Sequence, residues 1–464
     1  MTPTAKPLPR PFQRLAGSLG LLLATTLGAC AADRSAPLDQ GPHLADSPSR
    51  LVIDPSKLRL TALAAHRFDP SDGLDPIEVA TLAVLNNPDL QARRVAYKVV
   101  AAQAFSAGLL PDPQLALNLD SPVSPGPGLV TAYGVSPSID LVAIITHSAA
   151  LKAARASERQ ADLQLLWQEW SVAEQARALA VTVLFDEQKA AALQTLSKDI
   201  DERLHMSAKA YQRGDVAAPP RSADVAARLD ADVQAATAAK DAAKARGDLN
   251  ALLGLTPSVA LNLVEGATDP EPQPAEMDAA LGALSQRRPD LLALQAGYSA
   301  QQANVRKAIL SQFPVINLGF SRARDTSNIT TNGGSATLVI PIFNRNRGEI
   351  SVQAATRDQL AAEYRARLDQ TTADVAAARR ELEEARVVLD KLEAEVPALE
   401  AMVARAAPAY ARGDLDSGGY LALQQAAINK RAALIDQRLA VRLADIGVQT
   451  VLFLPMGSSE SQPR

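Results

Sequence analysis

The chain has 464 residues, a formal net charge of −4, 4% aromatic residues and a single cysteine. This acidic balance gives no support for nucleic-acid binding, which favours a basic face, and one cysteine excludes an internal disulfide. A chain of this length forms several domains or one elongated domain. Few aromatic residues together with abundant alanine favour long, thin helices over a thick globular core.

Residues 1–29 have the layout of a secretory signal peptide. Lys6, Arg10 and Arg14 precede an apolar run that begins at Leu15 and is too short to span a membrane as a helix. Removing this segment takes away three positive charges and no negative ones, so the net charge changes from −4 to −7.

The only cysteine follows the apolar run. Leu27-Gly28-Ala29-Cys30 resembles the lipobox of bacterial lipoproteins, in which the cysteine becomes the lipidated first residue of the mature protein. We therefore predict lipidation at Cys30. The alternative is a small residue near an ordinary signal-peptidase site. Ala31 stands where an aspartate tends to hold lipoproteins at the inner membrane, which indicates delivery to the outer membrane.

The first folded part is predicted to be a helix followed by a hairpin. Asp75-Pro76 is typical of a helix N-cap followed by proline at the first helical position, and this helix is expected to end at about Leu109. Leucines then alternate with other residues over 114–120, which predicts a strand. A loop rich in proline and glycine at 121–128 leads to a second strand at about 129–136.

A long helix comes next. No proline interrupts the segment from about Ile139 to Arg213, which would reach roughly 110 Å at about 1.5 Å per residue. Gly214 and two nearby prolines break it, and another helix returns to about Leu253.

The second half of the chain repeats these landmarks, in order, about 200 residues later. The pairs are Asn87-Pro88-Asp89-Leu90 with Arg288-Pro289-Asp290-Leu291, Leu110-Pro111 with Phe313-Pro314, Pro137 with Pro341, and Tyr211-Gln212-Arg213-Gly214-Asp215 with Tyr410-Ala411-Arg412-Gly413-Asp414. Each repeat is therefore predicted to form a helix, a hairpin, a long helix, a tight turn and a returning helix. The second hairpin is expected at about 315–322 and 335–340, joined by a polar turn.

Four strands cannot close a barrel alone, because small closed barrels need about eight. Open sheet edges also cannot face lipid. A sheet of this size that spans a membrane would have to be shared by several chains.

The second long helix carries two series of apolar and small residues with a spacing of seven. They are Ala361, Leu368, Val375, Leu382, Leu389 and Val396, and Tyr364, Thr371, Ala378, Ala385 and Leu392. This spacing predicts coiled-coil packing against a neighbouring helix. Pro397 lies within this helix, and we expect a bend there.

Taken together, these features resemble the TolC-like outer-membrane efflux family over nearly the whole mature chain, from about Leu74 to Phe453. The resemblance rests on the duplication, the paired landmarks and the strand-to-helix step Pro341-Ile342-Phe343-Asn344-Arg345-Asn346-Arg347-Gly348. It implies a mainly α fold with a small β part, in which a homotrimer forms a 12-stranded outer-membrane β-barrel continued by a periplasmic α-helical barrel. It also implies a periplasmic membrane-fusion adaptor and an inner-membrane pump of the resistance-nodulation-division type as partners, and no cofactor.

The expected parts follow from the landmarks. They are a signal peptide at 1–29, a lipidated extended tail at 30–73, a first repeat at 74–256, a linker at 257–276, a second repeat at 277–453 and a C-terminal tail at 454–464.

The two tight turns are the sharpest candidates for a functional role. In the family, the corresponding tips form the periplasmic end, meet the adaptor and close the aperture. The resemblance assigns this role to Arg213, Gly214, Asp215, Arg412, Gly413, Asp414 and Asp416. Rings of charge can govern ion passage. The alternative is ordinary turn chemistry with solvated charges, because glycine allows the backbone to reverse.

The strand-to-helix step of the second repeat gives a further candidate site at the junction of barrel and helices. Its residues are Asn344, Arg345, Asn346, Arg347 and Gly348. They would line the tunnel or anchor the protein at the membrane interface, and a packing or capping role is the alternative.

No Ser/His/Asp set or pair of carboxylates stands out, so we expect no enzyme activity. The histidines are scattered, and neighbours such as His205 and Met206 point in different directions on a helix. We therefore expect no metal site.

The leading hypothesis is a passive export duct that conducts small solutes or metal cations when adaptor and pump dock at the tips. The segment 341–348 looks most similar to members paired with heavy-metal cation pumps, while drugs and other small organic molecules stay open as substrates. The alternative is a non-conducting coiled-coil lipoprotein that tethers the layers of the envelope, which would not need the two hairpins.

Overall fold

The structure is a computed structural model that describes residues 36–124, 126–214, 218–266, 273–339, 341–412 and 414–456. The chain divides into two units, Met1–His43 and Leu44–Arg464, and the second is described below. The predicted signal peptide and Cys30 lie outside the described residues.

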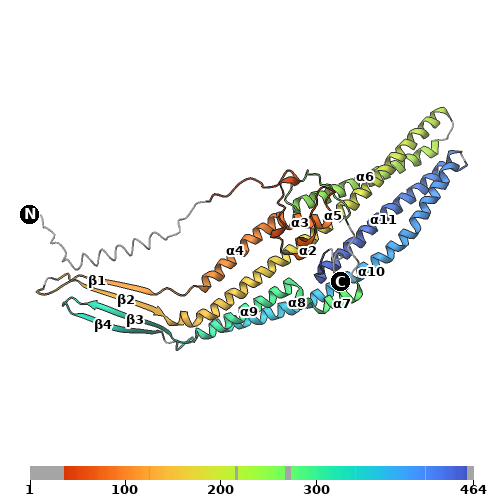
Figure 1. The fold of residues 1–464 in the computed structure, drawn as a ribbon. Coiled ribbons are helices and arrows are strands. Elements are labelled where there is room, and N and C mark those ends of the chain that lie inside the picture. The colour runs from red at the N-terminus through yellow and green to blue at the C-terminus, as the bar shows by residue number, and fades with distance from the viewer. Residues whose placement is uncertain are drawn as a thin grey trace, which may run out of the picture. The chain divides into compact units, whose positions relative to one another are not determined.

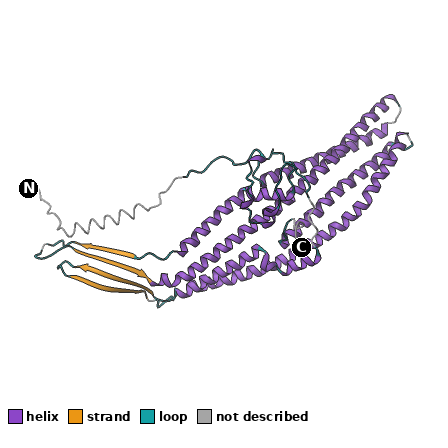
Figure 2. Cartoon of the chain, in the orientation of Figure 1, coloured by secondary structure: helices purple, strands orange, loops and turns teal. Residues whose placement is uncertain are grey.

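Within the second unit, long helices adjoin one four-stranded sheet of the described residues (Figures 1 and 2). The first half contains two 3₁₀ turns, η1 (Pro48–Arg50) and η2 (Pro55–Lys57), then α2 (Thr61–Ala65), α3 (Pro76–Asn86), α4 (Pro88–Gly108), β1 (Gln114–Asp120), β2 (Ala132–Asp140), α5 (Leu141–Arg213) and α6 (Ala218–Leu252). The second half contains α7 (Pro274–Gly282), α8 (Leu284–Arg287), α9 (Pro289–Leu310), β3 (Val315–Arg324), β4 (Thr330–Val339), α10 (Arg347–Ala411) and α11 (Ser417–Leu452). The prediction of a mainly α fold, with a small β part and a duplicated helix–hairpin–long helix–turn–helix order, is confirmed. No helix in the described ranges combines the length and the apolar character needed to cross a membrane.

The sheet joins the two repeats. Its order is β1-β2-β3-β4 with all pairs antiparallel, so the hairpin of each repeat contributes two strands and β2 lies beside β3. The outer sides of β1 and β4 have no strand partner in the described part of the chain.

Several strand boundaries differ from the sequence prediction, most of all the end of β2 and the start of β4. β2 runs to Asp140 because that carboxylate accepts hydrogen bonds from Val142 N (2.8 Å) and Ala143 N (3.2 Å), so the strand passes straight into α5. β4 begins at Thr330, well before the expected 335, because β-branched threonines at its start suit an extended backbone. The turn between β3 and β4 is correspondingly short.

The pairing register gives the sheet one mainly apolar face, which also carries Arg322, Arg324, Thr330 and Asn332 at one end, and one mainly polar face, which also carries Val339. Residues that face each other across the strands share a side, and alternate residues point to opposite sides. The apolar face carries Leu115, Leu117, Leu119, Tyr133, Val135, Pro137, Ile139, Ile316, Leu318, Phe320 and Leu338. The polar face carries Gln114, Asn118, Asp120, Ser136, Ser138, Asp140, Asn317, Ser321, Thr331, Ser335 and Thr337.

The helix expected to run from Leu74 to Leu109 is in fact two helices. Asn87 separates α3 from α4 with φ −55° and ψ 124°, because a residue before proline is driven out of the helical region. Its side-chain oxygen accepts a hydrogen bond from Leu90 N (2.9 Å), and its amide nitrogen donates to the carbonyl of Leu252 (2.9 Å). The Asn-Pro-Asp-Leu element is therefore a helix junction fastened to the end of α6.

The predicted N-cap of the first helix is confirmed as a capping box. The Asp75 carboxylate accepts hydrogen bonds from Ile77 N and Glu78 N, both at 2.8 Å, and the Glu78 carboxylate accepts one from Asp75 N at 3.0 Å. These contacts satisfy donors that the first turn of a helix otherwise leaves unpaired.

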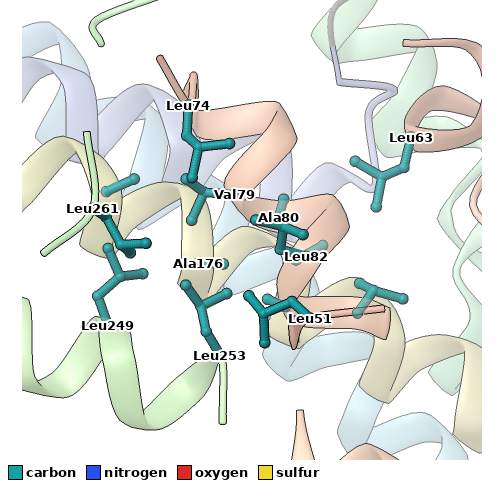
Figure 3. Packing of buried hydrophobic residues seen from close by; sticks show 14 of the residues in the cluster. Leu51, Leu63, Leu74, Val79, Ala80, Leu82, Ala176, Leu249, Leu253 and Leu261 are labelled. Carbon is teal, nitrogen blue, oxygen red and sulfur yellow. The ribbon is translucent and has the colours of Figure 1, made fainter. Parts of the chain in front are cut away.

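The largest apolar core, which we call the waist, lies where α3 meets the middle of α5 and the end of α6 (Figure 3). Leu74, Val79 and Leu82 pack there against Ala176 of α5, Leu249 of α6 and Leu253 directly after α6, and Leu51 and Leu63 cover them from the N-terminal segment. This core fixes the middle of the long helix α5.

The seven-residue series in α10 face the interior of the helical part. Every member of both series is buried or half-buried. Val375 and Leu382 pack with Val448 and Leu452 of α11. The helix continues through Pro397, where we predicted a bend, and through Pro408.

A buried ion pair stands at the helix junction of the second repeat. The Arg288 guanidinium, 3% exposed, binds both carboxylate oxygens of Asp290 at 2.8 and 2.9 Å and donates to the carbonyl of Val451 at 2.8 Å. It also lies 4.5 Å from the ring centre of Trp167, and Arg367 approaches Asp290 at 2.9 Å. Burial raises the pKa of Asp290, but the hydrogen bonds and charges of Arg288 and Arg367 outweigh it, so the pKa lies below its ordinary value.

Replacing Arg288 should destabilise the helical part more than replacing a surface arginine. We expect Arg288→Met to cost about 3 kcal/mol, near the low end for breaking a buried pair because Arg367 remains. The control Arg379→Met, which breaks the exposed pair with Asp278, should cost less than about 1 kcal/mol. Guanidinium unfolding in detergent, followed by far-ultraviolet circular dichroism, measures both. Equal effects would contradict the prediction.

The lowered pKa of Asp290 gives the same pair a pH dependence. Its contribution to stability is present above the unfolded pKa of 3.8 and is lost as the pH falls through the folded value. The stability difference between wild type and Arg288→Met should therefore shrink in acid below about pH 3.8.

Candidate functional site

The turn between α5 and α6 is the first predicted tip. Gly214 adopts φ +81°, a left-handed conformation that favours glycine, and its N–H donates to the carbonyl of Tyr211 at 3.0 Å. Arg213, the last residue of α5, is exposed. Asp215, the remaining predicted residue of this tip, lies outside the described residues.

The second tip is held by local contacts. The Arg412 guanidinium donates to the Asp414 carboxylate at 2.9 Å, with both side chains more than half exposed, and Asp414 N donates to the carbonyl of Ala409 at 2.9 Å. Asp416 caps α11 by accepting a hydrogen bond from Gly419 N at 2.8 Å. Gly413 lies outside the described residues.

These contacts separate the charged residues of the second tip by role. Asp416 performs a capping function, which is turn chemistry. Arg412 and Asp414 pair with each other but stay open to solvent, so both can also meet a partner. Tyr410 and Tyr420 stack beneath the turn with ring centres 4.7 Å apart, which braces α10 against α11.

Close to the tips, an apolar cluster links the helix pair α5–α6 to the helix pair α10–α11. Leu196 and Ile200 of α5 pack with Ala231 of α6 and with Leu421, which lies one turn into α11. If the two helix pairs moved apart, Leu421 would have to leave its contacts with α5 and α6.

The junction of sheet and helices differs between the repeats. In the first repeat, Asp140 leads directly into α5. In the second, Arg345 and Asn346 adopt positive φ values of 46° and 53°, and the Asn346 amide donates to the carbonyl of Ala308 at 2.8 Å, which ties the start of α10 to the end of α9. Arg347 N donates to the carbonyl of Asn344 at 3.0 Å.

The predicted residues of this junction therefore have different surroundings. Asn346 has a packing role, whereas Arg345, Arg347 and Gly348 are exposed. Phe343 beside them is 92% exposed. An apolar ring next to exposed arginines is suited to a membrane–water interface.

Two carboxylates that the sequence prediction missed lie on the polar face of the sheet. Asp120 and Asp140 are the only charged residues that the register of the described strands assigns to that face. The alternation of leucines over 114–120 already placed Asp120 on the face opposite to the leucines. The face to which Asp140 belongs could be assigned only once β2 was known to extend to that residue.

Among the described residues, no three His, Cys, Asp or Glu side chains gather where they would hold a metal ion. His205 lies 3.6 Å from Asp201, one turn away on the same helix, and its side chain is exposed.

The geometry has close counterparts among known proteins. Residues 280–452 match the family described as Outer membrane efflux protein. The Campylobacter jejuni CmeC outer membrane channel superposes with a TM-score of 0.70 at 15% identity, covering 93% of this chain and 96% of that chain. The outer-membrane channel OprN gives a TM-score of 0.70 at 16% identity over 90% and 98% of the chains, and CusC gives 0.68 at 16% identity over 91% and 99%. No curated protein matches the chain in sequence.

The fold is that of the TolC-like channel proteins. Within this fold, residues 280–452 match the outer membrane efflux protein family, so the resemblance seen in the sequence is confirmed.

The glycine of the first tip provides a test of its local structure. An alanine at φ +81° costs about 1–2 kcal/mol because its Cβ approaches the following carbonyl. Gly214→Ala should therefore increase the rate of trypsin cleavage after Arg213 about tenfold. Gly247→Ala, within α6 and with no neighbour near the added Cβ, should leave this rate unchanged. Equal rates for wild type and Gly214→Ala would contradict the prediction.

Proposed function

We propose that this protein is the outer-membrane channel of a tripartite efflux system, which passively conducts small solutes from an inner-membrane pump and a periplasmic adaptor to the outside. The observation that carries the proposal is the sheet: one face is mainly apolar, the other is mainly polar, and both edges are unpaired within the described chain. Such a sheet is a segment of a barrel wall, with lipid on one side and water on the other.

The unpaired edges support a homotrimer. Backbone groups at an open edge are costly in a hydrocarbon environment, so β1 of one copy would pair with β4 of the next. Four strands are too few for a barrel, whereas three copies provide twelve. The helices that continue from the strands would then form three adjoining walls around one lumen.

The length of the helices supports a path through the periplasm. α5 alone has 73 residues, or roughly 110 Å at about 1.5 Å per residue. Its far end carries the tip with Arg213 and Gly214, and the corresponding end of α10 carries Arg412 and Asp414. We propose that these tips contact the adaptor and close the resting aperture.

The charge of the polar face favours cations in the lumen. Asp120 and Asp140 would form two rings of three carboxylates, with no basic residue on that face of the described strands. Metal cations and cationic organic molecules both fit this charge. The similarity of segment 341–348 to members paired with heavy-metal pumps inclines the proposal towards metal cations.

Single-channel recording in a planar bilayer tests the duct, with the mass of the purified protein in detergent measured in parallel. We expect a trimer with discrete conductance steps, and a reversal potential in a salt gradient that shows cation preference. The double variant Asp120→Asn/Asp140→Asn should lower that preference; asparagine preserves the cap of α5. A monomer or dimer that never conducts would favour the tethering lipoprotein instead.

A matched pair of variants controls for the position of the charge. Asn118→Asp adds a carboxylate to the polar face and should increase cation preference, whereas Asn332→Asp adds one to the apolar face and should leave it unchanged. Equal effects of the two variants would overturn the assignment of the polar face to the lumen.

We further propose that the mature protein is a lipoprotein, anchored through Cys30 and extending into the periplasm. The support comes from the sequence Leu27-Gly28-Ala29-Cys30. Cells grown with labelled palmitate should incorporate label into the wild type and none into Cys30→Ala. Label that persists in the variant would reject the lipobox.

A further inference from the structure

Two arginines interrupt the apolar face of the sheet. Arg322 and Arg324 continue the row of Ile316, Leu318 and Phe320 on β3, because residues two apart share a side. Their cross-strand neighbours on β2 are Val135 and Tyr133. A basic side chain on a lipid-facing surface costs about 2–4 kcal/mol at the membrane midplane but little near the interface.

The position of the arginines along β3 places them near such an interface. Arg324 is the last residue of the strand, and the turn at 325–329 follows it, while the other end of β3 adjoins α9. From Ile316 to Arg324 the strand rises about 27 Å at about 3.4 Å per residue, or about 19 Å along the membrane normal at a tilt of about 45°. If the helices lie in the periplasm, as proposed above, this end of the strand reaches the outer leaflet.

The guanidinium of Arg324 is held in a defined orientation. It lies 5.0 Å from the ring centre of Tyr133 and donates a hydrogen bond to the carbonyl of Thr131 at 3.0 Å. Arginine can stack on an aromatic ring and still present further N–H groups to a phosphate.

Arg322 is exposed, and its cross-strand neighbours Val135 and Asn332 carry no charge. The nearest acids in sequence and register are engaged or directed elsewhere. Asp325 accepts a hydrogen bond from Ile329 N at 2.9 Å, and Asp120 belongs to the polar face.

The occupant of this surface follows from its location and charge. β3 is an inner strand with partners on both sides, so pairing between copies through β1 and β4 leaves its apolar face uncovered. Lipid is the remaining neighbour in a barrel wall. Two guanidinium groups at the end of an apolar face are complementary to a phosphate group borne by a lipid chain.

We propose that Arg322 and Arg324, with Tyr133, form a site for a phosphorylated lipid headgroup of the outer leaflet. The site rests on the proposed function, because it requires the apolar face to be in the membrane. Acyl chains would cover Leu318, Phe320 and their neighbours, and the phosphate would accept hydrogen bonds from the two guanidinium groups.

Native mass spectrometry of the purified full chain tests the site, with bis-phosphorylated lipid A as the probe and its dephosphorylated form as the matched control lipid. We expect the wild type to retain the phosphorylated form at least about tenfold more tightly. Arg322→Gln/Arg324→Gln should remove this difference, and Arg322→Gln alone, which keeps the contact of Arg324 with Tyr133, should reduce it. Arg405→Gln, an exposed arginine on α10, should preserve it.

Two outcomes would overturn the site: equal retention of both lipids by the wild type, or an undiminished phosphate preference in the double variant. Conductance and oligomeric state, measured on the same preparations, separate this failure from failure of the proposed function. A conducting trimer without phosphate preference refutes the lipid site alone, whereas a preparation that neither conducts nor forms trimers refutes the channel.

Discussion

The outer sides of β1 and β4 present backbone N–H and C=O groups that no other described strand satisfies. In water such groups are solvated, but in hydrocarbon each costs several kcal/mol. In the proposed barrel wall, a sheet with two open edges is therefore incomplete as a single copy. Each strand pair is preceded and followed by a helix. When the edge strands of neighbouring copies pair, these helices would be brought together as well.

The duplication has diverged where the two halves meet. In the first repeat, Asn87 caps α4 and binds the end of α6. In the second, Arg288 at the corresponding place binds Asp290 and the end of α11, and lies over Trp167 of α5. The same junction thus fastens each repeat to its own returning helix, and in the second repeat Arg288 also contacts the other repeat through Trp167. The hydrogen bonds of the buried Arg288 guanidinium fix the geometry of this contact between the repeats more narrowly than apolar packing alone would.

The sequence predicted most of the fold because its signals were local and repeated. Alternating leucines marked β1, Asp75 and Pro76 marked the start of α3, and the seven-residue series marked the inner side of α10. The break at Asn87 was missed because proline at a first helical position fits both a continuing pattern and a new start. Pro137 in β2 resembled a strand end, yet the strand continues, with its pairing to β3 interrupted between Val135 and Ser138.

The candidate site was less predictable because its signals are not local. Sequence identified the glycine at the first tip, but Asp416 proved to be a helix cap, and the roles of Arg412 and Asp414 depend on contacts between elements. The side of Asp120 could be read from the leucine alternation, but the side of Asp140 and that of the two arginines emerged only from the strand register, which no single segment determines.

Because α5 is one continuous helix from Leu141 to Arg213, a tilt at its middle would move its end. The waist holds it near Trp170 to Val183, and about 30 residues, or roughly 45 Å, separate that fulcrum from the tip. A rigid rod of this length moves its end by about 4 Å when it tilts by about 5°, with no change in its own hydrogen bonds. In the proposed channel, a small displacement at the waist would then be amplified at the tip, and the work of opening would fall on the side-chain contacts between helices rather than on the helices themselves.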